Sequence, residues 1–189
     1  MEIIEIKKVT LGDIEDLQKI GKQTFFETFA ESNTPENMNK YLEDSFSVKK
    51  LSEEFSNEYS DSFSVKKLSE EFSNEYSEFY FALSNGEVIG YMKLNTGGSQ
   101  TEAQQKESSE IERIYVLQDY HGKKVGQLLY EKAIQIAMKR RSEYVWLGVW
   151  EKNTRAISFY KKNDFVEFDK HIFVLGDDAQ TDIMMKKML

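Results

Sequence analysis

The chain of 189 residues contains no cysteine, a single proline and only two histidines, His121 and His171. Without cysteine it forms no disulfide, thiolate metal site or thiol nucleophile. Two histidines exclude a metal site built on several of them, and no carboxylate spacing is typical of one, so we expect no metal. No apolar run approaches the ~20 residues that cross a bilayer, and the charged start "MEIIEIKKVT" does not resemble a signal peptide. We therefore expect a cytoplasmic protein without a membrane segment.

Positive charge is also scarce, since 25 lysines and arginines face 33 aspartates and glutamates, a formal net charge of −8. Nucleic-acid affinity comes largely from Lys and Arg contacts to phosphate, so we expect no nucleic-acid partner. An acidic surface favours cationic partners, although most carboxylates on any protein serve only solvation. The length and a hydrophobic content of 40% are typical of one globular α/β domain, so we expect a single domain over residues 1–189.

An exact tandem repeat interrupts this ordinary composition. Residues 44–60, "DSFSVKKLSEEFSNEYS", are identical to residues 61–77. Structural repeats diverge in sequence, so one identical pair indicates a recent duplication, an engineered feature or an error in the record. Each copy has a helical apolar pattern, but 17 residues rotate a helix ~260° past whole turns, so one continuous helix would not turn both apolar faces to one core. We expect two separate helices, one of them extra, which compete for one place and allow a domain-swapped homodimer.

The apolar periodicities predict a mixed sheet with helices on both faces, an α/β (α+β) fold of about seven strands. The hairpin signal is Asn85-Gly86 between two apolar runs. A polar segment, 96–109, is expected to be a surface loop. We expect strands at 3–9, on both sides of Asn85-Gly86, at 109–117, at 143–150 and on both sides of Gly176-Asp177, and helices after Thr10, after Thr34, at 122–141 and at 153–163.

The loop between the strand at 109–117 and the next helix concentrates two glycines and two lysines within residues 121–127. Gly122 and Gly126 lack a Cβ, so a ligand's phosphate can approach the backbone closely. The N–H groups of residues 123–127 are the unsatisfied donors at a helix start, which is a good phosphate site. The alternative is an ordinary strand-to-helix turn. The spacing matches neither a nucleotide-hydrolysing P-loop nor a dinucleotide-binding loop.

The segment after the strand at 143–150, "NTRAISFYKKNDF", adds a second motif. With both motifs the chain resembles the GCN5-related N-acetyltransferases (GNAT), over essentially its whole length outside one repeat copy. The resemblance implies the GNAT fold and acetyl-coenzyme A (acetyl-CoA) as cosubstrate, in a V-shaped opening between two parallel strands. The family loop pattern Gln/Arg-x-x-Gly-x-Gly/Ala reads here His121-Gly122-Lys123-Lys124-Val125-Gly126. His121 and Lys124 depart from it, and Lys124 must adopt a backbone geometry that glycine tolerates more easily.

The resemblance also assigns roles along the coenzyme. The loop holds the diphosphate, the strand backbone and Asn153 bind the pantetheine arm, and Tyr160 is the general acid near the sulfur. The alternatives are a simple helix cap for Asn153 and a core aromatic for Tyr160. The expected coenzyme-binding residues are Ile114, Tyr115, Val116, His121, Gly122, Lys123, Lys124, Val125, Gly126, Gln127, Asn153 and Tyr160.

Two glutamates are candidates for the base that deprotonates the amine. Glu110 and Glu112 lie two apart on one strand, so they share a face if no bulge intervenes. A carboxylate there takes the amine proton if burial raises its pKa. The alternative is a solvated strand edge or an ion pair near Arg113. We slightly favour Glu112 over Glu110.

Segments such as "TFFETFAESNTPENMNKYL" resemble the PaiA group of bacterial acetyltransferases, which act on spermidine and spermine. This resemblance implies a polyamine acceptor. We expect residues 25–41 to wall the acceptor side, with Glu27 and Glu31 attracting ammonium groups and Phe29 packing along methylenes, although helical spacing explains the aromatics equally well as core. Other readings are an acceptor that is another small amine or a protein N-terminus, and a non-catalytic acyl-CoA-binding regulator.

Overall fold

A computed structural model describes residues 3–30, 76–102, 107–175 and 178–189. Several predictions fall outside these residues. They are the helix after Thr34, the position of Glu31, the turn at Gly176-Asp177, and the repeat apart from its last residues, Tyr76 and Ser77.

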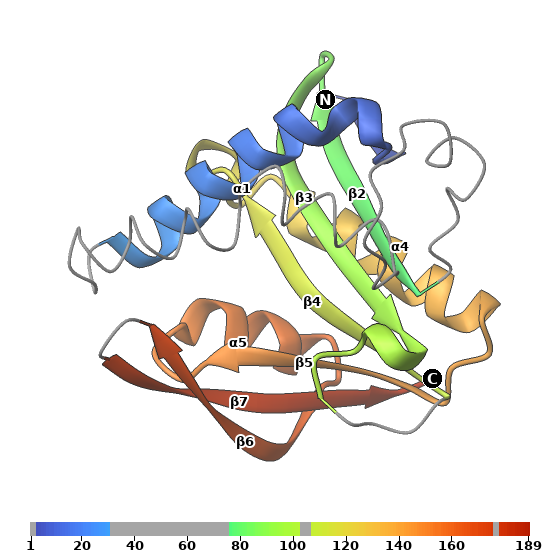
Figure 1. Cartoon of the computed structure of the whole chain (residues 1–189), viewed down its shortest axis with the longest axis vertical. Coiled ribbons are helices and arrows are strands. Elements are labelled where there is room, and N and C mark those ends of the chain that lie inside the picture. The colour runs from blue at the N-terminus through green and yellow to red at the C-terminus, as the bar shows by residue number, and fades with distance from the viewer. Residues whose placement is uncertain (1–2, 31–75, 103–106, 176–177) are drawn as a thin grey trace, which may run out of the picture.

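The described strands form one seven-stranded mixed sheet, which confirms the prediction of about seven strands, and their order in it is β1-β2-β3-β4-β5-β7-β6 (Figure 1). Its strands are β1 (Ile4–Lys8), β2 (Ser77–Ser84), β3 (Glu87–Thr96), β4 (Ser108–Val116), β5 (Tyr144–Trp150), β6 (Val166–Leu175) and β7 (Asp178–Met188). β4 and β5 run parallel, and the other described neighbours are antiparallel.

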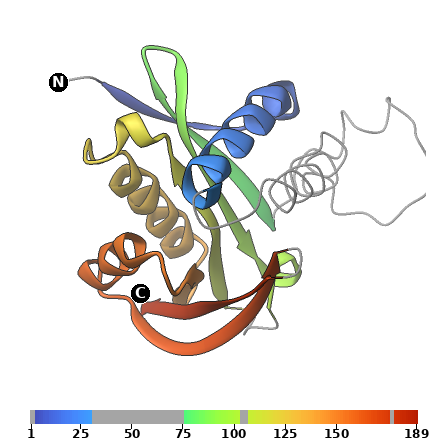
Figure 2. The same cartoon turned by 90° about the vertical axis from the view of Figure 1, so that its left-hand side faces the viewer.

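The longer helices lie on opposite faces of the sheet (Figure 2). These helices are α1 (Ile14–Phe29), α4 (Val125–Lys139) and α5 (Thr154–Lys162), with short 3₁₀ turns η1 (Leu11–Asp13), η3 (Gly97–Ser99) and η4 (Gln118–Tyr120). The alternation of strand side chains explains the two layers. In β2, Phe79 and Phe81 pack with the α1 residues, whereas Tyr80 and Ala82 join the core that contains α4 and Tyr160.

Local chemistry sets the helix starts. Before α1, Asp13 Oδ2 accepts hydrogen bonds from the backbone N–H of Thr10 at 2.9 Å and from its hydroxyl at 2.7 Å. Helix α4 begins at Val125 instead of near residue 122, because Gly122 (φ 80°) and Lys124 (φ 66°) are left-handed. The prediction that Lys124 adopts a glycine-like geometry is therefore confirmed. Within the described residues, no helix is long and apolar enough to cross a bilayer.

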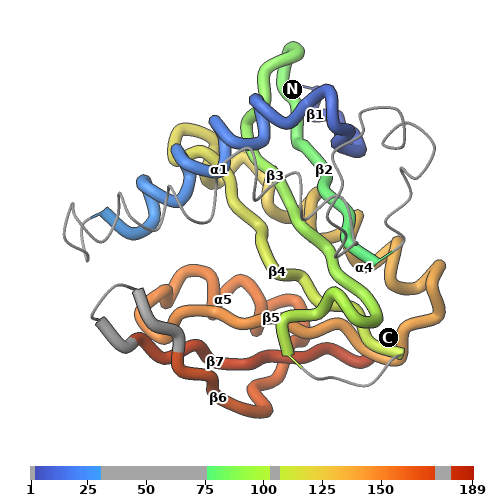
Figure 3. Tube along the Cα trace, viewed as in Figure 1, coloured from blue at the N-terminus to red at the C-terminus, as the bar shows by residue number. Residues whose placement is uncertain are grey.

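The two parallel strands part soon after they meet. β4 and β5 pair only from Ser108↔Tyr144 to Glu110↔Trp146. Beyond that point β5 stays paired on its other edge with β7, as far as Trp150↔Asp182, while the trace of β4 leads away (Figure 3). The backbone of residues 111–116 therefore faces an opening between the strands.

Candidate active site

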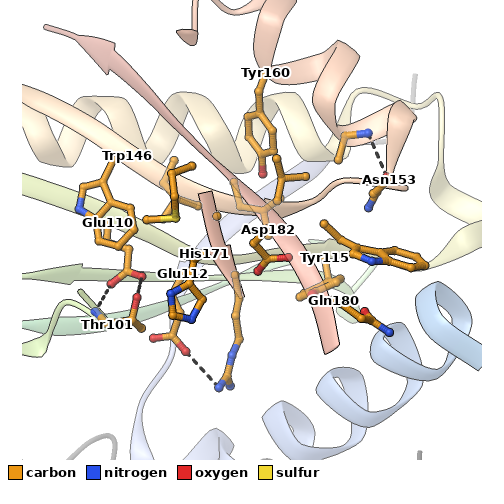
Figure 4. A pocket seen from close by; sticks show the side chains of 18 of the residues that line it. Thr101, Glu110, Glu112, Tyr115, Trp146, Asn153, Tyr160, His171, Gln180 and Asp182 are labelled. Atoms are coloured by element: carbon orange, nitrogen blue, oxygen red, sulfur yellow. Dashed lines mark hydrogen bonds and ion pairs between the residues drawn. The ribbon is translucent and has the colours of Figure 1, made fainter. Parts of the chain in front are cut away.

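A cavity of about 400 Å³ occupies the place where β4 and β5 part. We call it the β4–β5 cavity. Side chains from both helical layers, from β4 and β5 and from the β6–β7 hairpin line it (Figure 4). Its lining includes Phe25, Phe29, Thr101, Glu102, Glu110, Glu112, Arg113, Ile114, Tyr115, Trp150, Asn153, Tyr160, His171 and Asp182.

Tyr160 reaches the cavity from α5, with its phenol directed inward (Figure 4). The residue is only 8% exposed, and its ring packs against Phe159 and Phe165 at centroid distances of 5.3 and 5.5 Å. Burial raises the pKa of the phenol, so it carries its proton at neutral pH. A protonated phenol facing a cavity is equipped to donate that proton.

Asn153 caps α5 and lines the same cavity. Its Oδ1 accepts a hydrogen bond from the backbone N–H of Ala156 at 3.0 Å. Because the cap uses the oxygen, the amide nitrogen is the part of the side chain available for a ligand. The two roles that the sequence suggests for Asn153 are therefore compatible.

The 121–127 loop presents backbone donors at the start of α4. The first helical hydrogen bond runs from Leu128 N–H to the Lys124 carbonyl, so the N–H groups of residues 124–127 precede it. Lys123 N–H is used differently, since it donates to the Tyr120 carbonyl at 3.4 Å. The left-handed residues Gly122 and Lys124 shape this turn. Amide donors at the start of a 15-residue helix fit a phosphate group.

His121 lies in this loop, but both of its ring nitrogens already face protein groups. Nε2 is 2.8 Å from the Val116 carbonyl oxygen, and Nδ1 is 2.5 Å from Arg155 Nη1. A carbonyl only accepts and a guanidinium only donates, so Nε2 donates to Val116 and Nδ1 accepts from Arg155. A direct contact between His121 and phosphate stays a prediction. Arg155, brought here from α5, was not a candidate in the sequence.

Glu110 and Glu112 both line the cavity, although a β-bulge separates them. In the β3–β4 ladder Lys93 pairs with Arg113 and Leu94 with Ile111, so Glu112 is the extra residue. The sequence places Glu110 and Glu112 on one face of the strand only if no bulge intervenes. Because Glu112 is a bulge residue, that condition is not met. Their carboxylates nevertheless converge, since both accept from Asn95 Nδ2.

The two glutamates have opposite electrostatic surroundings. Burial alone would raise the pKa of Glu112, but the charges of Arg113 and Lys93 lower it to about 2. Lys93 Nζ lies 2.7 Å and Arg113 Nη2 3.1 Å from the Glu112 carboxylate. Glu110 is 3% exposed, and burial raises its pKa against hydrogen bonds from Thr101 and Asn95. Glu110 is therefore the better proton acceptor near neutral pH.

Thr101 belongs to the segment expected to be an exposed loop. Its backbone N–H donates to Glu110 Oε2 at 2.8 Å, and its hydroxyl donates to Oε1. Its neighbour Gln100 accepts from Trp146 Nε1 at 2.6 Å. This part of the 96–109 segment is thus built into the cavity wall.

The acceptor side differs from the sequence-based expectation in its acidic residues. Phe25 and Phe29 line the cavity as expected, and the Phe29 ring lies 5.6 Å from that of Trp150. Glu27 instead accepts from the Gln118 backbone N–H at 2.8 Å and from Gln23 at 3.0 Å. Its role with substrate stays a prediction.

Acidic residues that the sequence did not single out stand at the cavity instead. Asp182 on β7 is the register partner of His171 on β6, and His171 Nδ1 pairs with Glu102 at 2.9 Å. Burial raises the pKa of Asp182, and His171 only partly opposes this. Its carboxylate lies over Gly148, where a Cβ would stand 3.5 Å from Oδ2. The isolated charge in the apolar pattern "DIMM" was the available signal.

Among the described residues, no group of three His, Cys, Asp or Glu side chains is placed to hold a metal ion. Glu102, Asp182 and His171 all line the cavity.

Comparison with known proteins agrees with this geometry. Residues 40–165 match the model of the acetyltransferase (GNAT) family. An uncharacterized N-acetyltransferase of Lactobacillus delbrueckii subsp. lactis is 36% identical over 98% of both chains. A spermidine N(1)-acetyltransferase of Thermoplasma acidophilum is 25% identical over 86% of this chain and 88% of its own.

The structure of the PaiA N-acetyltransferase from Thermoplasma acidophilum, solved with coenzyme A, superposes with a TM-score of 0.75. It is 25% identical and covers 99% of each chain. The GNAT fold predicted from the sequence is thus confirmed, with its parted parallel strands and its amide-rich turn. The chain belongs to the GNAT acetyltransferase family and is an acetyl-CoA-dependent N-acetyltransferase.

Proposed function

We propose that the enzyme acetylates a primary amine of a small polyamine such as spermidine or spermine. The observation that carries this proposal is that a buried carboxyl with a raised pKa, Glu110, and a protonated phenol, Tyr160, line one cavity with further acidic residues. The similarity to a spermidine acetyltransferase supports the choice of acceptor.

The coenzyme supplies the acetyl group as a thioester. The chain fits it through the backbone of residues 114–116 along the opening, the amide of Asn153, and the N–H groups of residues 124–127. These groups bind and orient the coenzyme, which leaves the reacting atoms to the cavity.

Glu110 takes the proton of the acceptor amine, directly or through a water molecule. An alkylamine is mostly ammonium at neutral pH and must lose a proton before it attacks a thioester. A carboxylate with a raised pKa does this better than Glu112, whose pKa of about 2 makes it a weak base. Glu112 instead keeps Lys93 and Arg113 paired. We therefore assign the base to Glu110, whereas the sequence alone slightly favoured Glu112.

Tyr160 donates its proton to the departing thiolate. Burial raises the pKa of its phenol, so the group keeps its proton until the thiolate departs. A proton donor positioned in the cavity contributes on the order of 10²- to 10⁴-fold in rate.

The acidic lining holds the remaining ammonium groups of a polyamine. Asp182 and Glu102 supply negative charge at one side of the cavity, while Phe25 and Phe29 offer apolar surface to methylenes. A flexible chain of alternating cationic and apolar groups matches this wall.

The test is a thiol-release assay with acetyl-CoA and a panel of spermidine, spermine, butylamine and a peptide with a free N-terminus. We expect the highest kcat/KM with spermidine or spermine. A higher kcat/KM with the peptide would redirect the proposal to protein N-termini, and a preference for butylamine would remove the polyamine.

A further inference from the structure

Arg155 places a guanidinium group at the 121–127 loop, although it belongs to the first turn of α5. Its Nη1 lies 2.5 Å from His121 Nδ1, which joins α5 to the connection between β4 and α4. Within the described part of the chain, the guanidinium makes no hydrogen bond other than this one. The other N–H donors of its planar fork remain available to a ligand.

Cations gather at this corner of an otherwise acidic protein. Lys123 and Lys124 flank the turn before α4, with Lys123 Nζ 4.5 Å from the Tyr120 ring centroid, and Arg155 faces the same turn. The chain as a whole carries a formal net charge of −8. A local positive patch beside backbone N–H donors favours an anionic ligand group.

The surroundings of His121 explain why an arginine is needed here. The position matches the Gln/Arg that opens the family loop pattern, yet Nε2 is bound to the Val116 carbonyl and Nδ1 to Arg155. The imidazole therefore has no nitrogen left for a phosphate oxygen. Because Val116 fixes the proton on Nε2, Nδ1 must accept, and it orients the guanidinium.

We infer that Arg155 binds a phosphate group of the coenzyme and that His121 is its positioning residue. This inference depends on the proposed function in one respect, namely that the β4–β5 cavity and the 121–127 loop bind coenzyme A. A guanidinium fork matches the geometry of phosphate oxygens, and a held fork loses less rotamer freedom on binding than a free one.

The first experiment measures dissociation constants for coenzyme A by calorimetry. Arg155→Ala should weaken binding about tenfold or more, the size of one charge-assisted hydrogen bond. Lys162→Ala is the matched control, since it removes one exposed cation from the far end of the same helix and should stay within about twofold of the unmodified enzyme. Equal affinities of Arg155→Ala and the unmodified enzyme would overturn the inference.

Two further probes identify the phosphate. With 3′-dephospho-coenzyme A, a penalty for Arg155→Ala that persists assigns the contact to the diphosphate, and one that vanishes assigns it to the 3′-phosphate. With acetylpantetheine, which has no phosphate, Arg155→Ala should turn over like the unmodified enzyme. An equal penalty with acetylpantetheine would show a general structural effect and overturn the inference.

A double-mutant cycle tests the positioning role of His121. His121→Ala should weaken coenzyme A binding, but should add little in the Arg155→Ala background. His121→Asn places an acceptor oxygen near the position of Nδ1 and should restore part of the loss. If the losses of coenzyme A affinity were additive, or if His121→Asn restored none of the loss, the positioning role of His121 would be contradicted. If the unmodified enzyme bound no coenzyme A, the proposed function would fail instead.

Discussion

Glu110 and Glu112 accept hydrogen bonds from the same atom, Asn95 Nδ2, at 3.1 and 2.6 Å, yet their pKa values shift in opposite directions. Glu112 lies within ion-pair distance of Lys93 and Arg113, whereas Glu110 accepts hydrogen bonds from Thr101 and Asn95 and is exposed to the negative charge of Glu112. One carboxylate is therefore fixed as an anion, and the other is free to exchange a proton. Substitution of the two glutamates should therefore have different effects.

Glu110→Gln should lower kcat/KM for spermidine at least about 100-fold, because the variant keeps the shape but has no base. In the unmodified enzyme kcat/KM should rise with pH through the raised pKa of Glu110, above the ordinary value of 4.5. That limb of the pH profile should be missing in the variant.

Thr101→Val provides a companion to that measurement. It removes a hydroxyl whose hydrogen bond lowers the pKa of Glu110, so the limb should move to higher pH. An unmoved limb in Thr101→Val, together with a rate for Glu110→Gln within about threefold of normal, would assign the base elsewhere.

Glu112→Gln should instead lower the free energy of unfolding, by about 3–5 kcal/mol, because it removes the carboxylate that lies within ion-pair distance of both Lys93 and Arg113 in a largely buried site. The side chains of Lys93 and Arg113 are only 8% and 12% exposed, so hydration replaces little of the lost attraction to Glu112. Urea unfolding at neutral pH measures the difference. A loss under about 1 kcal/mol would mean that the pair does not hold β3 to β4.

The pH dependence of this loss has a defined sign. The folded pKa of Glu112, about 2, lies below the ordinary value of 4.5, so its stabilisation is complete above 4.5. It should fade as the pH drops from 4.5 toward 2, and the gap between the unmodified enzyme and Glu112→Gln should shrink there. A gap that stays constant through this window would contradict the shift.

Tyr160→Phe should reduce kcat about 100-fold or more while changing the dissociation constant of acetyl-CoA less than about threefold. The variant keeps the ring that packs against Phe159 and Phe165 and loses only the proton donor. Rapid-mixing assays at saturating coenzyme, with calorimetry for affinity, measure both quantities. An equal loss of turnover and affinity would argue against an acid role.

The sequence predicts best what short-range geometry decides. The cap by Asn153 and the left-handed backbone of Lys124 follow from neighbours a few residues away, and both are found. The seven strands follow from the two-residue alternation, which sorts Phe79 and Tyr80 to opposite layers.

The sequence does not predict the site residues whose position depends on strand register or on a loop that folds back onto the sheet. Asp182 reaches the cavity only because β7 pairs with β5, and Thr101 only because its loop folds back onto Glu110. The bulge at Glu112 has no local signal. Glu27 binds the backbone of Gln118 and His121 that of Val116, and such exposed pairings cannot be predicted from residue spacing.

Lys124→Gly should be more stable than Lys124→Ala by about 1 kcal/mol, because φ 66° strains every residue with a Cβ. Both variants remove the same charge, so the comparison isolates the backbone. At Lys132, inside α4, the order should reverse by about the same amount. Thermal unfolding measures both pairs, and the same order at the two positions would show that position 124 is not strained.

Asp182→Asn should raise KM about tenfold for 1,4-diaminobutane and spermidine, since it removes the charge that holds a second ammonium group. For butylamine, which has the same four-carbon chain and one nitrogen, KM should change less than about twofold. Asp169→Asn on β6 is the control, because Asp169 is exposed, bonds its neighbour's N–H and lies outside the cavity lining. Steady-state assays at saturating acetyl-CoA measure KM for each amine in both variants and in the unmodified enzyme. If butylamine suffers the same loss as the diamine, Asp182 acts on the reacting amine or on the fold, and the acidic wall does not select for a second positive charge.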